Sequence, residues 1–225
     1  MILLPETDIP HFPPTELADA DGLVAFGGKL STDWLLSAYI QGIFPWFNQG
    51  DPILWWSPDP RMVLFPHHLK IAKSMRPYFN QKKFRTTTNT SFEQVLRACS
   101  QTKRRGQKGT WITESMVEAY LKMHLSGWAH SVEVWNPNGN LVGGLYGLVI
   151  GKVFFGESMF SREKNASKFG FISWIQLLTA HGIKLIDCQI YSEHLQSLGA
   201  MEISREEFKS YLKEWTATTE RLKLV

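Results

Sequence analysis

The chain has 225 residues, of which 44% are hydrophobic and 20% are charged, as in ordinary globular proteins. The longest apolar run, residues 141–151, is too short for a membrane span and contains four glycines. The first residues lack the basic start of a secretory signal, and two cysteines cannot make a disulfide framework. We therefore expect a cytoplasmic protein with no membrane association.

The net charge of +3 conceals one strongly basic block. Residues 66–110 hold eleven basic side chains and a single acid, Glu93, whereas residues 1–65 hold two basic and eight acidic side chains. A solvated face is the structural alternative, but the self-repulsion of such a block favours a polyanionic partner. The residues that we expect to hold phosphates are Lys82, Lys83, Arg85, Lys103, Arg104 and Arg105.

Beyond a proline-rich start, the sequence predicts a helix at 33–41, an aromatic loop at 43–47 and a short strand at 54–56. Ser31 or Thr32 can cap the helix, and Gly42 suits the position after its end. The run Ser57-Pro58-Asp59-Pro60 must interrupt any regular element. We therefore expect a small N-terminal domain at residues 1–60 and a second domain at residues 61–225.

The second domain alternates helices and strands. The expected strands are residues 62–65, 84–88, 130–135, 141–150, 153–160 and 184–190. The expected helices are residues 68–79, 91–100, 115–125, 169–180, a short one from 193, and 206–215, and residues 101–110 are predicted to form a basic loop. Three consecutive strands followed by helix, strand and helix indicate an α+β, acetyltransferase-like domain, with a mostly antiparallel sheet flanked by helices.

Two polar residues interrupt the apolar strand at 184–190. Because alternate residues of a strand share a face, Asp187 and Gln189 should point one way, and Cys188 the other way with Ile186 and Ile190. A thiol among aliphatic groups is a poor nucleophile, so Cys188 is expected to be a core residue. Buried polar groups need partners, either a neighbouring loop or a functional site, and the convergence of two favours a site.

Two kinds of residue elsewhere suggest ligand contacts. Trp46 and Trp111 follow glycine-containing turns, and Trp111 also follows the basic loop, a combination that suits the phosphates and bases of single-stranded RNA. Core packing is the alternative for both, as for most of the nine tryptophans. Glu157 interrupts an aromatic strand after Gly156, so it lies either in solvent at a sheet edge or in a site.

Several chemistries lack their sequence patterns. No cysteine pair has zinc-ligand spacing, and His67 and His68 are adjacent, so no metal is expected. There is no P-loop and no Gly-x-Ser-x-Gly elbow. Residues 161–168 lack the glycine-rich turn that would hold the pyrophosphate of acetyl-CoA.

The chain resembles the bacterial leucyl/phenylalanyl-tRNA–protein transferases. The matching stretches are GLVAFGGKLS, GIFPWF, DPILWWSPDPR, GTWIT, HSVEVW, LVGGLYG, FFGESMFSR, NASK, KLIDCQ and HLQSLGA, in one order from about Gly22 to Ala200. The resemblance implies transfer of Leu, Phe and, less well, Met from aminoacyl-tRNA to proteins with N-terminal Arg or Lys. It places the activity in the bacterial N-degron pathway and implies no coenzyme. We expect a monomer.

The resemblance also assigns residues. Trp46 and Trp111 correspond to tryptophans that contact the terminal adenosine. Glu157, Asp187 and Gln189 correspond to the polar site, where Glu157 could hold the basic side chain of the acceptor. The residues that correspond to the amino-acid pocket are Phe154, Met159, Trp174 and Leu178.

Two proton routes and two other function classes stay open at this point. Gln189 could orient the attacking amine while Asp187 fixes its side-chain amide, or the ribose 2′-hydroxyl of the tRNA could relay the proton. A small-molecule N-acetyltransferase would be stabilised by coenzyme A. A non-catalytic RNA-binding protein would bind tRNA without transfer.

Overall fold

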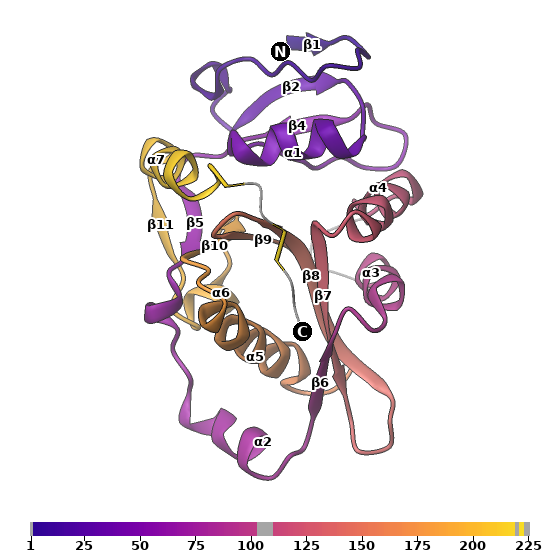
Figure 1. Ribbon diagram of the computed structural model, residues 1–225, viewed down its shortest axis with the longest axis vertical. Helices are drawn as coiled ribbons and strands as arrows, with labels where there is room; N and C mark the ends of the chain where they lie inside the picture. The colour runs from indigo at the N-terminus through magenta and orange to yellow at the C-terminus, as the bar shows by residue number, and fades with distance from the viewer. Residues whose placement is uncertain (1, 103–109, 219–220, 223–225) are drawn as a thin grey trace.

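Two β-sheets organise the chain, a small N-terminal sheet and a larger one below it in Figure 1. The computed structural model describes residues 2–102, 110–218 and 221–222. The small sheet has the order β1 (Ile2–Leu4), β2 (Leu23–Gly27), β4 (Leu54–Trp56), β3 (Phe44–Pro45). Only β4 was predicted, because β1, β2 and β3 lie in proline- and glycine-rich stretches without strand alternation.

Helix α1 (Thr32–Ile40) lies between the small sheet and the larger one (Figure 1). It begins as predicted, since the Ser31 hydroxyl accepts a hydrogen bond from the Trp34 backbone N–H at 3.4 Å. It ends before Gly42, whose φ of +79° suits glycine. Its buried face includes Tyr39, which reaches down toward the larger sheet.

The larger sheet has seven strands in the order β11 (Met201–Ile203), β5 (Arg61–Leu64), β10 (Leu185–Gln189), β9 (Val153–Ser161), β8 (Leu141–Ile150), β7 (Ala129–Trp135), β6 (Arg85–Thr88). All neighbouring pairs are antiparallel except β9 and β10, which run parallel. A meander of three strands therefore leads through a helix to a parallel fourth. This order confirms the predicted α+β, acetyltransferase-like domain.

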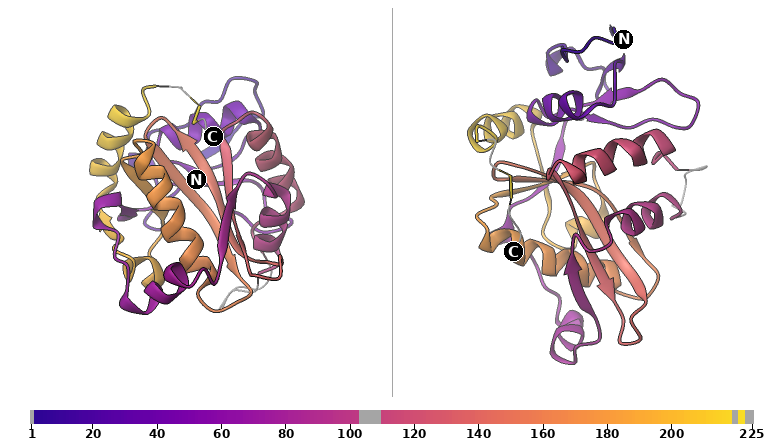
Figure 2. Two further views of the ribbon diagram at one scale, coloured as in Figure 1. Left: turned by 60° about the horizontal axis from the view of Figure 1, so that its bottom comes forward. Right: turned by 45° about the vertical axis from the view of Figure 1, so that its right-hand side comes forward.

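Helices cover both faces of the larger sheet (Figure 2). On one face α3 (Phe92–Ser100) and α4 (Glu114–Leu125) share a hydrophobic core with α1 and with α7 (Arg205–Trp215). On the other face α5 (Ala166–Ala180) packs in a second core with residues from α2 (Arg76–Asn80) and α6 (Glu193–Gln196). The sheet thus separates two cores, and each face of β9 and β10 meets a different one.

Two bulges open the sheet between β9 and β10. In β9 the pairing with β8 shifts between Gly156 and Ser158, which leaves Glu157 as the extra residue. In β10 the pairing with β5 shifts between Asp187 and Gln189, which leaves Cys188 as the extra residue. The two parallel strands pair only up to Asp187, opposite Phe155, and then separate. Bulges commonly re-aim side chains in this way beside functional sites.

One predicted element is wrong. The basic helix expected at residues 68–79 is instead two short 3₁₀ turns, Pro66–His68 and Lys73–Met75, followed by α2. Pro77 lies in the first turn of α2, and a proline cannot continue a helix from upstream because it lacks an N–H and crowds the preceding turn. The basic side chains of residues 66–80 therefore lie on irregular backbone and short turns instead of along one helix face.

Candidate active site

A cavity of about 290 Å³ lies where β9 and β10 separate, beneath the loop that leads from the N-terminal sheet. Its walls come from the segment of β3 and the residue after it, from Trp111 ahead of α4, from β8, β9, α5 and β10, and from the start of α6 with the residues before it. The predicted site residues that line it are Trp46, Trp111, Phe154, Glu157, Met159, Asp187 and Gln189. The fold thus gathers predicted side chains from four separate parts of the chain into one concave site.

Two residues expected in the amino-acid pocket do not line the cavity. Trp174 and Leu178 are fully buried on α5, in the core behind β9. Phe154 packs edge-on against the Trp174 ring, with the centroids 5.5 Å apart, and Phe154 itself faces the cavity. Helical spacing placed Trp174 and Leu178 on the buried face of α5 correctly, but that face supports the pocket wall from behind.

Other apolar residues complete the wall. Phe171, one turn before Trp174, lines the cavity together with Leu145, Ile186 and Leu195. Sequence reasoning missed these four because each is an ordinary apolar residue of its helix or strand. Together with Phe154 and Met159 they form a surface that suits a large apolar side chain.

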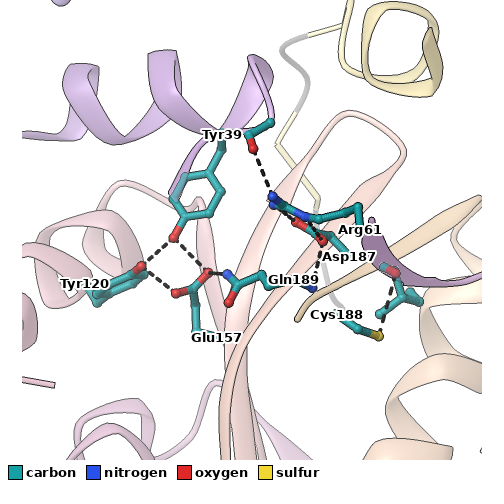
Figure 3. A network of polar contacts seen from close by, with 9 residues as sticks. Tyr39, Arg61, Tyr120, Glu157, Asp187, Cys188 and Gln189 are labelled. Carbon is teal, nitrogen blue, oxygen red and sulfur yellow. Dashed lines mark hydrogen bonds and ion pairs between the residues drawn. The ribbon is translucent and has the colours of Figure 1, made fainter. Parts of the chain in front are cut away.

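Arg61 forms a buried, bidentate ion pair with Asp187 (Figure 3). Arg61 Nε donates to Asp187 Oδ1 at 2.8 Å, and Nη2 donates to Oδ2 at 2.7 Å. The third nitrogen of the guanidinium donates to the carbonyl of Gly42 at 3.0 Å, just past α1. The sequence analysis missed Arg61, although an arginine directly after Pro58-Asp59-Pro60 at the start of an apolar strand was a usable signal.

Asp187 orients the backbone of Gln189. The Gln189 N–H donates to Asp187 Oδ1 at 2.9 Å, and Gln189 adopts a left-handed φ of +64° at the end of β10. A non-glycine residue in this region needs such support. The expectation that Asp187 fixes the side-chain amide of Gln189 is wrong, because that amide donates to Glu157 Oε1 at 3.0 Å instead.

Glu157 accepts as many hydrogen bonds as Asp187, but from uncharged donors (Figure 3). Its Oε1 accepts from the Tyr39 hydroxyl at 2.8 Å as well as from Gln189, and its Oε2 accepts from the Tyr120 hydroxyl at 2.7 Å. Burial raises the pKa of Glu157 to about 7, against the lowering effect of the two tyrosine hydrogen bonds. Its oxygens accept three internal hydrogen bonds, and the side chain also lines the cavity, so the role expected for Glu157 toward the basic side chain of the acceptor stays a prediction.

Cys188 points away from this polar network (Figure 3). It packs with Ile186 against the core behind α5, as strand alternation predicted, but Cys188 is only half-buried and also lines the cavity. Burial raises the pKa of its thiol, so the nucleophilic thiolate is disfavoured. The grouping of Ile190 with them is wrong, since β10 ends at Gln189 and Ile190 is 46% exposed.

Of the predicted basic residues, Lys82 and Lys83 lie between α2 and β6, and Arg85 is the first residue of β6; none of the three lines the cavity. Lys82, Lys83 and Arg85 are exposed, and none of them forms an ion pair with another residue of the described part of the chain. Lys83 lies 5.3 Å from the Tyr78 ring, and Arg85 lies 5.3 Å from the Trp135 ring. Lys103, Arg104 and Arg105 lie outside the described residues.

Two further findings bear on the class of site. Among residues 2–102, 110–218 and 221–222, no three His, Cys, Asp or Glu side chains come together as metal ligands. In the same ranges, no helix combines the length and apolar character that crossing a membrane requires.

Comparison with known proteins identifies close relatives. Residues 63–213 match the family described as leucyl/phenylalanyl-tRNA protein transferase, and residues 28–59 match the N-terminal domain of the same family. The chain is 61% identical to the leucyl/phenylalanyl-tRNA–protein transferase of Christiangramia forsetii over 203 residues, which cover 89% of this chain and 95% of that protein. It is 55% identical to the corresponding protein of Flavobacterium johnsoniae over 202 residues, 90% of this chain and 95% of that protein.

Similarity to solved structures is much weaker. The structure of L-PGS from Bacillus licheniformis is 12% identical, with a TM-score of 0.42, over 84% of this chain and 63% of that chain. Values this low support no argument about chemistry.

Proposed function

The chain belongs to the leucyl/phenylalanyl-tRNA–protein transferase family and is an aminoacyltransferase, and from this premise we propose its substrates. The donor is a tRNA charged with Leu, Phe or, less well, Met. The acceptor is the N-terminal α-amine of a protein that begins with Arg or Lys. The observation that carries the proposal is the single cavity, in which an apolar wall, two tryptophans and a polar cluster meet.

The donor end of the tRNA fits the mouth of this cavity. Trp46 and Trp111 both line it while packing on the core beneath, and we infer that the terminal adenosine stacks on them. The exposed surface of Lys82, Lys83 and Arg85 offers positive charge for the phosphates of the tRNA body. In this proposal, stacking on the tryptophans binds the aminoacylated end of the tRNA, and the basic side chains bind the phosphates of its body.

The apolar wall supports selection of the transferred amino acid. Phe154, Met159 and Phe171 suit Leu, Phe and Met, and charged side chains would lose their hydration there. Such a wall distinguishes ligands that differ by one methylene by only about 1–3 kcal/mol. Use of several large apolar amino acids follows from this weak discrimination.

The reaction requires positioning more than activation, because the aminoacyl ester is already reactive. Alignment of an amine with an ester carbonyl supplies roughly 7–11 kcal/mol of the barrier reduction. Gln189 is well placed to orient the amine, since its backbone is held by Asp187 and its amide by Glu157. Its side-chain carbonyl remains an acceptor for an N–H of the incoming amine.

The acceptor preference and the cellular setting rest on family resemblance. We propose that acceptors with N-terminal Arg or Lys are used, that the product enters the bacterial N-degron pathway, and that the protein acts in the cytoplasm as a monomer. Glu157 lies in the wall of the cavity and has no ion-pair partner among the described residues, which is compatible with a cationic acceptor.

One transfer experiment tests the proposal. The protein is incubated with radiolabelled Leu-tRNA and peptides that differ only in beginning with Arg, Lys or Glu, and labelled peptide is measured. Label on the Arg and Lys peptides alone is expected, with Lys-tRNA as a donor that gives none. Binding of tRNA without transfer would support an RNA-binding protein instead, and acetylation of an amine with acetyl-CoA would support an N-acetyltransferase.

A further inference from the structure

A carboxylate and two phenol hydroxyls form a closed triangle (Figure 3), of which the carboxylate, Glu157, lines the cavity. The Tyr39 hydroxyl lies 2.8 Å from Glu157 Oε1, the Tyr120 hydroxyl lies 2.7 Å from Oε2, and the two hydroxyl oxygens lie 2.5 Å apart. Tyr39 comes from α1, Tyr120 from α4 and Glu157 from the bulge of β9. Three distant elements therefore converge on one small polar group.

The number of protons in this triangle depends on the state of Glu157. Each tyrosine hydroxyl has one proton to donate. With Glu157 ionised, two protons must serve three short oxygen–oxygen contacts, so one contact lacks a hydrogen. With Glu157 protonated, three protons serve the three contacts in a ring: Glu157 to Tyr120, Tyr120 to Tyr39, and Tyr39 back to Glu157. The geometry therefore has room for one additional proton.

The surroundings also favour uptake of a proton. The polar and charged groups that face Glu157 are Tyr39, Tyr120 and Tyr146, the Gln189 amide, and the Arg61–Asp187 pair behind it. The Arg61 guanidinium donates two hydrogen bonds to Asp187, so the positive charge nearest to Glu157 is already compensated by another carboxylate. A second negative charge on Glu157 has no cation of its own among the described residues.

The triangle is within reach of the reacting amine. Glu157 and Gln189 both line the cavity, and the Gln189 amide nitrogen lies 3.0 Å from Glu157 Oε1. An amine held at the Gln189 carbonyl is therefore one side-chain amide away from Glu157, a separation that one bridging water can span for proton transfer.

We propose that Glu157 is the general base of the transfer, and that Tyr39 and Tyr120 are positioning residues whose hydroxyls hold its carboxylate in place. This inference rests on the proposed function. The acceptor ammonium gives one proton to Glu157, and the resulting amine nitrogen attacks the ester carbonyl carbon. As the C–N bond forms, the bond from that carbon to the tRNA 3′-oxygen breaks, and the 3′-oxygen takes a second proton from the amine nitrogen. Glu157 then releases its proton to solvent.

The acid–base properties of the three residues agree with these roles. Burial raises the pKa of Glu157 to about 7, near the pH at which a general base is most effective. Burial also raises the pKa of Tyr39 and of Tyr120 well above the ordinary value, so both hydroxyls keep their protons at neutral pH.

The test is the pH profile of steady-state transfer, measured as kcat/KM for an N-terminal Arg peptide with saturating Leu-tRNA. The wild-type rate should rise with pH through about 7. Glu157→Gln should be slower by at least about 100-fold, with a profile that follows only the peptide amine, near 8. Tyr39→Phe and Tyr120→Phe each remove a hydrogen bond that lowers the pKa of Glu157, so the rise should move to higher pH.

The matched control is Tyr211→Phe, whose hydroxyl bonds Glu207 on α7 away from the cavity, and its profile should equal that of the wild type. A purely structural role for the tyrosines would lower the rate equally at every pH without moving the rise. That outcome, or a Glu157→Gln variant with the wild-type rate and profile, overturns the inference. A wild-type protein that transfers nothing would instead refute the proposed function, so the two failures are distinguishable.

Discussion

Arg61 and Asp187 form an ion pair in which both side chains are fully buried, with two hydrogen bonds of 2.8 and 2.7 Å. The guanidinium also lies 4.8 Å from the Phe44 ring of the N-terminal sheet and 4.6 Å from the Phe208 ring of α7. Arg61 therefore connects α1, through Gly42, and the N-terminal sheet to the strand that carries Gln189. Its work is to keep Asp187 in place, and through Asp187 the backbone of Gln189.

Breaking this pair on either side should be strongly destabilising. Asp187→Ala leaves a buried guanidinium unpaired, and Arg61→Ala leaves a buried carboxylate unpaired, so each should lower the free energy of unfolding by about 3–5 kcal/mol. The double variant should lose less than the sum, since the second change removes the charge left by the first. Denaturant unfolding measures all three. Fully additive losses would show that the two side chains do not act as a pair.

Asp187 should also affect transfer more than binding. Because it holds Gln189, Asp187→Ala should reduce the single-turnover rate more than it reduces tRNA affinity. Gln189→Ala should do likewise. Equal losses of rate and affinity in variants that remain folded would count against a role in positioning the amine.

Cys188 should be dispensable for chemistry. Cys188→Ala removes a side chain from the core opposite the polar network and should cost roughly 1–3 kcal/mol of stability while most of the activity remains. Single-turnover transfer at saturating substrates, with unfolding measured in parallel, checks both parts. A folded but inactive variant would point to a thioester intermediate and contradict the geometry.

The basic surface should bind the body of the tRNA, whereas the two tryptophans should bind its aminoacylated end. Charge reversal of Lys82, Lys83 and Arg85 should weaken binding of all tRNAs alike, and the log–log salt slope should fall by about 0.7–0.9 per contact removed. Lys213→Glu, an exposed change on α7, is the control. An affinity that does not depend on salt would contradict the prediction.

Trp46→Ala and Trp111→Ala should each cost about 1–3 kcal/mol of donor binding through lost stacking. The loss should be the same for whole Leu-tRNA and for a minimal donor, leucyl-adenosine. The charge-reversal variants should lose affinity only for whole tRNA. Competition binding with both donors measures the difference, and a tryptophan variant that loses only whole-tRNA binding would remove these residues from the adenosine contact.

Glu157 should give stability an unusual dependence on pH. Its pKa is raised from 4.5 in the unfolded chain to about 7 in the folded protein, so folding favours its protonated form. That contribution is fully present below pH 4.5 and is lost as the pH rises through about 7, by an amount of up to about 3 kcal/mol. Glu157→Gln should unfold with a smaller dependence in this window. Identical curves for the two proteins between pH 5 and 8 would contradict the raised pKa.

Much of the architecture could be predicted because it depends on local patterns. The Ser31 cap, the spacing of α4 and the alternation within β7, β8 and β9 are properties of neighbouring residues, and the helices and strands formed there. The separation of Cys188 from Asp187 and Gln189 was predicted for the same reason. Local patterns failed at β1, β2 and β3, where the partners of each strand, rather than its own sequence, stabilise it.

The sequence by itself determined the fold class, the concentration of basic residues and, through its motifs, the family. Only the tertiary structure decided which residues form the site. Arg61, Tyr39 and Tyr120 are far from Asp187 and Glu157 in the chain, and nothing in their local spacing indicates that they meet. The same holds for Trp174 and Leu178, which local spacing marked as buried without indicating that Phe154 lies between Trp174 and the cavity. A buried polar group must find partners wherever the fold brings them, so its contacts are set by packing over long sequence distances.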